Sequence, residues 1–205
     1  MTPEDIADYI EGIMQPSERL IQRHVLVWLA TEAQRIGPHG YCVNIGTWCG
    51  ATACALALGG PTVVAIDTFT ATDAHTGAQA LERIKPGTLS TFTAFVNYHN
   101  HMPQPIRILA GIGRSADVAK ALGREEYDLV FLDGDHSLTG VRDDLAAWTP
   151  MLKRDGLLCG HDLAIPSVKE AVEQFVADSG WPIIGYEPVA DIWWTRKSCQ
   201  WISAN

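Results

Sequence analysis

Short runs of apolar residues alternate with segments of helical spacing over most of the chain. The apolar runs are short enough to be strands buried on both faces, and they cover residues 41–45, 62–66, 106–110, 128–132 and 156–160. The segments between them, at 51–58, 115–122 and 141–153, have the composition or spacing of helices. Because parallel strands need crossover connections, this alternation predicts a doubly wound, mostly parallel α/β sheet.

The N-terminal 39 residues lie outside this alternation and are expected to be helical. Thr2-Pro3-Glu4-Asp5 combines a cap, a proline at the first helical position and acids in the first turn. A second helix is predicted from near Ser17 to Gly37, because its apolar residues fall on one face and Gly37-Pro38 stops it.

The C-terminal part adds a helix and a hairpin. Ser167-Val-Lys-Glu170 has the spacing of a capping box, and the helix that it predicts ends near Ser179-Gly180. Residues 183–186 and 192–195 predict an antiparallel hairpin. We expect a single domain over residues 1–205.

Residues 68–105 form an unusually long connection between the second and third predicted strands. A helix is predicted at 89–98, and the earlier part is interpreted as a variable insertion that acts as a lid over the site. A passive insertion is the alternative. His75, His99 and His101 lie in this stretch and are expected to be solvated surface residues.

The composition excludes several classes of partner. The 205-residue chain has a formal net charge of −9 and no cluster of Lys and Arg, which argues against nucleic acid and favours a small-molecule substrate. No apolar run approaches the roughly 20 residues that span a membrane. The acidic start of the chain is unlike a signal peptide, so a cytoplasmic protein is expected. The five cysteines form no CxxC pair and are interpreted as buried free thiols.

Three turns at predicted strand ends suit a nucleotide-like cofactor. The first contains Gly46 and Gly50, and this GxxxG spacing is looser than the GxGxxG turn that packs a pyrophosphate. Asp67 ends the second strand, where a carboxylate can accept both ribose hydroxyls. Gly113 and Ser115 follow the third strand. Each signal has a structural alternative, namely helix–strand packing, a helix cap or a glycine-rich turn.

Acids and imidazoles follow the fourth and fifth predicted strands. Asp133, Asp135 and His136 follow one strand, and His161 and Asp162 follow the other. Ligands of open α/β sheets bind beyond the carboxyl ends of the strands, so these side chains are expected to meet there. The alternatives are a turn at Asp133-Gly134 and helix caps at Asp135 or Asp162.

These motifs resemble a known family. Residues 44–52, 113–117 and 131–133 are similar to motifs of catechol-type O-methyltransferases, which are class I enzymes dependent on S-adenosylmethionine (SAM). Residues 131–136 and 155–162 are still more similar to a bacterial group that includes macrolide-sugar and cephalosporin-tailoring methyltransferases. The resemblance implies a Rossmann-like fold with the terminal hairpin on the sheet. It covers roughly residues 40–67 and 106–165.

The resemblance also implies roles for individual residues. It places the methionine part of SAM among Gly46, Thr47, Trp48, Gly50 and Thr52, the ribose at Asp67, and the adenine at Gly113 and Ser115, with Asp133 also beside the cofactor. Asn44 stands where the relatives carry an acid. Its amide can hydrogen-bond the cofactor but does not attract its ammonium group by charge.

The residues after the fourth and fifth predicted strands are the candidates for catalysis and metal binding. By the resemblance, Asp133, His161 and Asp162 fall on metal-ligand positions, with His161 where relatives carry an acid. The carboxylates suit Mg²⁺, and an imidazole shifts the preference towards metals such as Mn²⁺. His136 falls where the catechol-type enzymes have their catalytic lysine, and an imidazole suits a general base.

The sequence therefore predicts a methyltransferase that moves a methyl group from SAM to a hydroxyl oxygen of a small molecule, with or without a divalent metal. The alternatives are a SAM-binding or partner-binding module without catalysis and a nucleotide-cofactor enzyme on a similar sheet. A homodimer is compatible with the sequence.

Overall fold

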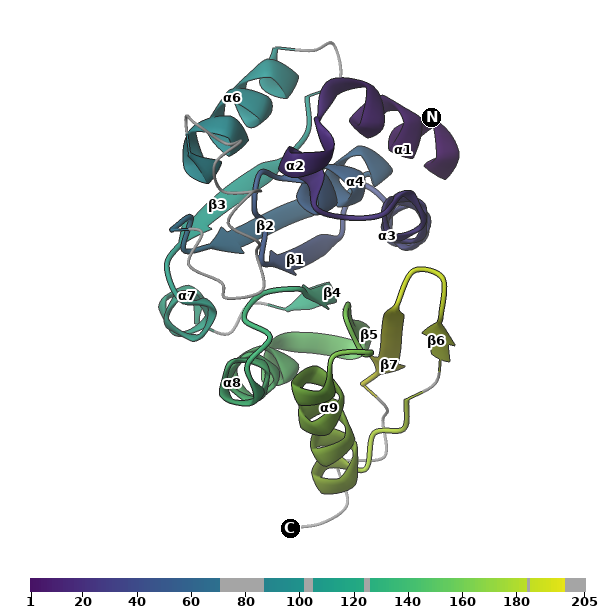
Figure 1. Ribbon diagram of the computed structural model, residues 1–205, viewed down its shortest axis with the longest axis vertical. Coiled ribbons are helices and arrows are strands. Elements are labelled where there is room, and N and C mark those ends of the chain that lie inside the picture. Colours follow the sequence, from purple (N-terminus) through teal and green to yellow (C-terminus); the bar gives the residue numbers. More distant parts are fainter. Residues whose placement is uncertain (71–86, 102–104, 124–125, 184, 198–205) are drawn as a thin grey trace.

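A seven-stranded sheet runs through the middle of the molecule (Figure 1). This computed structural model describes residues 1–70, 87–101, 105–123, 126–183 and 185–197. The strand order is β3-β2-β1-β4-β5-β7-β6. The strands from β1 to β5 pair in parallel, and β7 is antiparallel to both β5 and β6. The strands are β1 (Tyr41–Ile45), β2 (Thr62–Asp67), β3 (Ile108–Ile112), β4 (Tyr127–Leu132), β5 (Leu152–Gly160), β6 (Gly185–Glu187) and β7 (Ile192–Arg196). The predicted doubly wound sheet with a C-terminal hairpin is confirmed.

Helices cover both faces of the sheet and bury an apolar core on each side (Figure 1). Successive side chains of a strand point to opposite faces, so Leu129 and Phe131 of β4 enter one core and Val130 and Leu132 the other. The first core is covered by α1 (Pro3–Ile13), α3 (Arg23–Ile36), α4 (Ala51–Gly59) and α6 (Thr88–Asn100), with the short α2 (Pro16–Arg19) beside them. The second is covered by α7 (Ser115–Leu122), α8 (Leu138–Trp148) and α9 (Pro166–Ser179).

Several predicted helix boundaries are wrong. The helix expected from Ser17 onwards is two helices, because Leu20 adopts a left-handed conformation (φ 51°) that ends α2. Ser167 is not a cap, since α9 begins one residue earlier at Pro166 and the Ser167 hydroxyl donates to the His136 carbonyl (2.6 Å). The helix predicted at 141–153 gives way at Thr149–Met151 to a 3₁₀ turn that contains Pro150, and β5 begins at Leu152.

The long connection after β2 is described only in part. Its helix α6 is confirmed, whereas residues 71–86 and 102–104, with His75 and much of the expected lid, lie outside the described residues. His99 is not a surface residue. It is 2% exposed and lies 2.9 Å from the Tyr9 hydroxyl, which joins α6 to α1.

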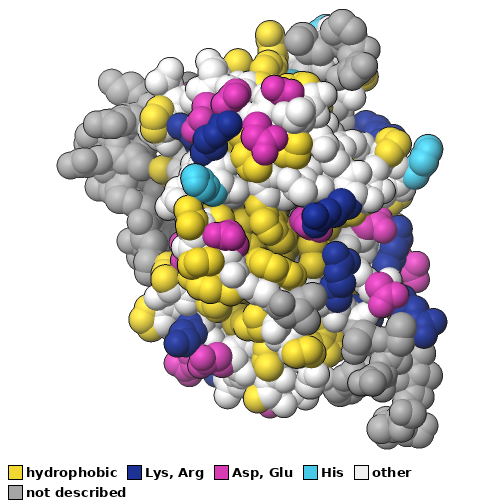
Figure 2. Space-filling model, turned by 90° about the vertical axis from the view of Figure 1, so that its right-hand side faces the viewer, with side chains coloured by type: hydrophobic (Ala, Val, Ile, Leu, Met, Phe, Trp, Pro, Cys, Tyr) yellow, Lys and Arg dark blue, Asp and Glu magenta, His cyan; other side chains and the backbone are white. Residues whose placement is uncertain are grey.

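Apolar side chains also reach the outer surface beside the terminal hairpin. Figure 2 shows hydrophobic side chains gathered in the middle of the face at the right of Figure 1, with charged side chains around them. Trp194 of β7 packs against Trp28 of α3, with ring centroids 5.5 Å apart, and both side chains are partly exposed. Trp193 points inward and is 1% exposed.

The prediction that the cysteines are buried free thiols is confirmed for those that the structure describes. Cys42, Cys49, Cys54 and Cys159 are buried and free, and Cys199 lies outside the described residues. Among the described helices, none has both the length and the apolar character needed to cross a membrane.

The turns after β1 and β4 are in direct contact. The Asp133 amide donates to the Ile45 carbonyl (3.0 Å), and a Cβ added at Gly46 would lie 1.8 Å from the Asp133 carbonyl oxygen. Gly46 also has φ +78°, which side chains disfavour. Only glycine fits here without moving β4 away from β1.

We therefore expect Gly46→Ala to destabilise the fold far more than Gly37→Ala. Both glycines have φ +78°, but nothing lies within 4 Å of a Cβ at Gly37. Gly37 has ψ −174°, a conformation that is essentially restricted to glycine, so Gly37→Ala should cost about 1–3 kcal/mol for its backbone conformation alone. Gly46→Ala should lose a further ~1–3 kcal/mol for the collision. Urea unfolding of the two variants measures the difference, and equal losses would contradict the contact.

Candidate active site

The turn after β1 is held by backbone and side-chain hydrogen bonds. The amides of Gly46 and Thr47 both donate to the Ile66 carbonyl of β2 (2.9 and 3.2 Å). Asn44 is fully buried beneath the turn, and its Oδ1 accepts from the hydroxyls of Thr47 (3.1 Å) and Thr52 (2.9 Å). The neutral Asn44 thus organises the turn from below.

Two further residues give the turn its shape. Trp48 has φ 52°, a conformation that a large side chain adopts only where its surroundings enforce it. Gly50 has φ +104° and caps α4, and an added Cβ would lie 2.9 Å from the Phe92 ring. Gly50 therefore permits close packing of α6 on the turn.

Asp67 connects the turns after β1 and β2. Its carboxylate accepts from the backbone amides of Trp48 and Phe69, each at 2.7 Å. Burial raises the pKa of Asp67, and these amides oppose the rise because they favour the charged form. The Asp67 carbonyl also accepts from the Gly113 amide (3.0 Å), which joins the turn after β3 to the other two.

Ser115, at the start of α7, lies in a buried polar network. The Trp148 indole donates to its hydroxyl (2.5 Å), and Asp144 of α8 lies beside it. Burial raises the pKa of Asp144 to about 6, and the nearby Asp135 and Asp143 add to the rise, whereas the hydrogen bond with Ser115 and the charge of Arg114 oppose it. Asp144 is only 8% exposed.

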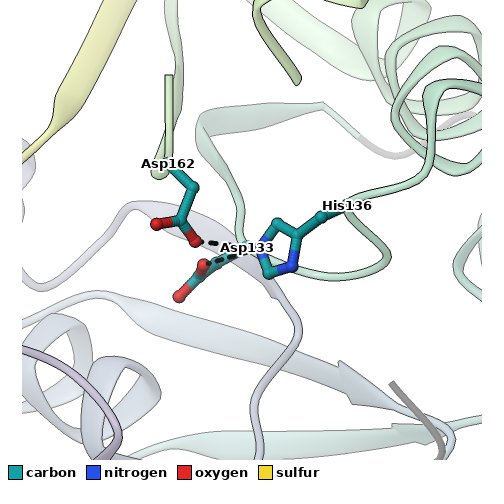
Figure 3. A group of neighbouring side chains, drawn as sticks. All are labelled: Asp133, His136 and Asp162. Carbon is teal, nitrogen blue, oxygen red and sulfur yellow. Dashed lines mark ion pairs between the residues drawn. The ribbon is translucent and has the colours of Figure 1, made fainter. Parts of the chain in front are cut away.

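Two acids and two imidazoles after β4 and β5 form one cluster, and Figure 3 shows three of them, Asp133, His136 and Asp162. Asp162 Oδ2 lies 2.9 Å from His136 Nε2 and 3.1 Å from His161 Nδ1. Asp133 Oδ1 lies 3.7 Å from His136 Nε2 and 3.4 Å from His161 Nδ1. The structure therefore brings four of the five predicted residues together at adjacent strand ends. The fifth, Asp135, lies outside the cluster and accepts from the Ser137 amide (2.8 Å).

The carboxylates control the charge of this cluster. They raise the pKa of His136 to about 10, chiefly through Asp133 and Asp162, against the effect of burial. Burial lowers the pKa of His161, but the same two carboxylates outweigh it and raise the value to about 10. The two imidazoles in turn hold the pKa of Asp162 well below its usual range despite its burial. In the absence of a bound cation, the carboxylates therefore favour the protonated form of both imidazoles.

The turns after β1, β2, β3, β4 and β5 surround one cavity of about 940 Å³. All the predicted site residues line it except Asn44 and Gly50, which support the turn from outside the cavity. Sequence reasoning did not identify Asp144 or the N-terminal residues Arg19, Leu20 and Ile21, which also line it. Neither group carries a motif, and Leu20 adopts its left-handed conformation in a segment that was expected to be helical.

A family model described as a methyltransferase domain matches residues 43–163. This range contains the turns after β1 to β5 and the carboxylate–imidazole cluster. The chain belongs to this methyltransferase family. It is a SAM-dependent enzyme, and both the expectation of a non-catalytic module and that of a nucleotide-cofactor enzyme give way to this assignment.

Solved structures share the fold of this methyltransferase at low sequence identity. The O-methyltransferase NovP is 16% identical over 84% of this chain and 80% of its own, with a TM-score of 0.60. A putative caffeoyl-CoA O-methyltransferase from Staphylococcus aureus is 14% identical over 96% of this chain and 92% of its own, with a TM-score of 0.64. A putative RNA methyltransferase from Pyrococcus horikoshii is 13% identical over 97% of this chain and 100% of its own, with a TM-score of 0.61. No curated protein sequence gives a significant match. These similarities fix the fold and leave the acceptor open.

The raised pKa of Asp144 predicts a pH-dependent effect of Asp144→Asn. A carboxyl whose folded pKa is about 6 rather than 3.8 favours the folded state at low pH, and this contribution is lost as the pH rises through 6. Relative to the parent, Asp144→Asn should therefore gain stability between pH 4 and pH 7, by at most ~3 kcal/mol.

Denaturant unfolding at several pH values measures this difference. Asp143→Asn removes the neighbouring carboxylate, whose side chain is 50% exposed, and controls for the change in net charge. If the stability difference between the parent and Asp144→Asn did not change with pH, the pKa of Asp144 would not be raised in the folded protein.

Proposed function

We propose that this methyltransferase transfers the methyl group of SAM to a hydroxyl oxygen of a small molecule. The observation that carries the proposal is the carboxylate–imidazole cluster, which lines the same cavity as the three turns predicted to hold the cofactor. Such a cluster offers groups that can orient a hydroxyl and take its proton.

The cofactor is proposed to lie across the ends of β1, β2 and β3. Its methionine part lies at Gly46, Thr47, Trp48 and Thr52, its ribose at Asp67, and its adenine at Gly113 and Ser115. The support is that these residues line one continuous cavity in the order of the strands, β1 beside β2 and β2 beside β3. The methyl group then faces Asp133, which lies against Gly46.

The proposed reaction is an in-line displacement. The acceptor oxygen approaches the cluster where His136 Nε2 and the carboxylates meet, and Nε2 takes its proton when the imidazole is neutral. A divalent cation on the two carboxylates would favour the neutral imidazole, because it would offset the negative charges that raise the pKa of His136. The oxygen forms a bond with the methyl carbon while the carbon–sulfur bond breaks and its electron pair passes to sulfur. The products are the methyl ether and S-adenosylhomocysteine.

The donor set of the cluster fits a divalent cation. Ligand atoms of Asp133, His136 and Asp162 lie within 4.8 Å of one another, and His161 Nδ1 reaches the same carboxylate oxygens. We propose that the two carboxylates bind Mg²⁺ or Mn²⁺ with an imidazole as third ligand, namely His161 if His136 is the base. A bound divalent cation would orient the acceptor oxygen and lower its pKa.

A small neutral or cationic acceptor is favoured over a nucleic acid. Six carboxylates line the cavity, on Asp67, Asp133, Asp135, Asp143, Asp144 and Asp162, and they repel a polyanion. A reducing compartment such as the cytoplasm suits the four free thiols.

S-Adenosylhomocysteine should bind the isolated protein with micromolar affinity, and Asp67→Ala should weaken this binding at least ~100-fold. The expected size follows from two lost hydrogen bonds to a charged group. Calorimetric titration measures both constants. Asp67→Asn, which keeps one oxygen for the backbone amides of the turn, controls for local folding and should lose less. Failure of the parent protein to bind would overturn the cofactor proposal.

The chelator-treated protein should bind Mn²⁺ or Mg²⁺, and Asp162→Ala should reduce this affinity at least ~100-fold, because even partners that only orient a metal ligand contribute 10- to 100-fold. Asp135→Ala removes a nearby carboxylate outside the cluster, which accepts from the Ser137 amide, and should leave binding intact.

The same metal titration distinguishes the roles of the two imidazoles, His136 and His161. If the proposed roles are correct, His161→Ala loses the metal and His136→Ala keeps it. The reverse result would exchange the roles, and metal binding unaffected by Asp162→Ala would refute the site.

A further inference from the structure

The N-terminal segment places a cation in the wall of the cavity. Arg19, the last residue of α2, lines the cavity together with Leu20 and Ile21. The Trp48 indole donates to the Ser17 carbonyl (3.1 Å) and so joins this segment to the turn after β1. Arg19 thus belongs to the end of the cavity where that turn lies.

The guanidinium of Arg19 has a donor that is not used within the described part of the protein. Its side chain is 14% exposed, and Nη1 donates to Glu11 Oε1 (2.6 Å). Its Nε is buried and has no hydrogen-bond partner in the described part of the chain. A buried donor of a charged group that lacks a partner is costly, so this arrangement favours an acceptor supplied by a ligand.

The turn after β1 has no charged side chain of its own. Its polar side chains are those of Asn44, Thr47 and Thr52, and they bond mainly to one another. The acids of the cavity lie instead at the ends of β2, β4 and β5 and on α8. The methionine part of SAM carries an ammonium group and a carboxylate. With Asn44 neutral, the turn has no charge that attracts the ammonium, whereas Arg19 attracts the carboxylate.

We propose that Arg19 binds the α-carboxylate of the methionine moiety of SAM. This inference rests on the proposed function, since it assumes that the methionine part lies at the turn after β1. A guanidinium matches a carboxylate with two parallel hydrogen bonds, and both groups are charged. The residue binds the cofactor at a distance from the reacting methyl group. In this enzyme the methionine tail is held through its anionic end.

Two ligands that differ only in this carboxylate test the proposal. Calorimetry is performed on the full chain with S-adenosylhomocysteine and with its decarboxylated analogue, which keeps the amine and the thioether. The parent should prefer S-adenosylhomocysteine at least ~10-fold. Arg19→Gln should weaken S-adenosylhomocysteine binding about 10- to 100-fold and change binding of the analogue less than about threefold, so that the preference disappears.

Arg23→Gln is the matched control. Arg23 also pairs with Glu11 (3.5 Å) and carries the same charge, but it does not line the cavity. It should retain the preference, and Arg19→Lys should recover part of it.

The outcomes separate this proposal from the proposed function. If the parent binds neither ligand, the cofactor site itself is refuted and this inference with it. If the parent binds both and Arg19→Gln retains the preference, or weakens both ligands equally, Arg19 does not bind the carboxylate, while the methyltransferase site stands.

Discussion

The site depends on the contact between the turns after β1 and β4. These neighbouring parallel strands end at the same level, and Gly46 has no side chain to hold the Asp133 backbone away. The first acid of the cluster therefore lies against the turn proposed to hold the methionine part. Since methyl transfer needs both reactants aligned within contact distance, a side chain at Gly46 would widen the spacing on which that alignment depends.

Sequence patterns predicted the strands and the residues at their ends because these follow from local rules. A short, mostly apolar run bounded by glycines, such as Tyr41–Ile45, is typical of a buried strand. Parallel strands bring their carboxyl ends to one edge of the sheet. The structure brings Asp133, His136, His161 and Asp162 together for that reason. Asn44 lies within β1, one residue before its end, and its inward direction makes it a support of the turn rather than part of the cavity wall.

Features set by tertiary contacts were not predictable in this way. The break at Leu20 has no glycine or proline at that position to announce it, so one helix was expected where α2 and α3 lie. The break also places Arg19 in the cavity wall. Similarly, His99 looked like a solvated histidine until its contact with Tyr9, ninety positions away, became visible. Side chains that connect distant segments leave no periodic signal in the sequence.

The balance of charge in the cluster matters for the proposed reaction. The sulfonium charge of SAM disperses as the methyl group leaves, so a free carboxylate beside it would stabilise the starting state more than the transition state. Asp162 is instead engaged by His136 and His161, and Asp133 lies near both imidazoles. Pairing of each acid with imidazoles, or with a divalent cation, directs the negative charge away from sulfur and towards the groups that bind the acceptor oxygen. His161 would act in the same direction, because an imidazole adds a possible ligand to the cluster without adding negative charge.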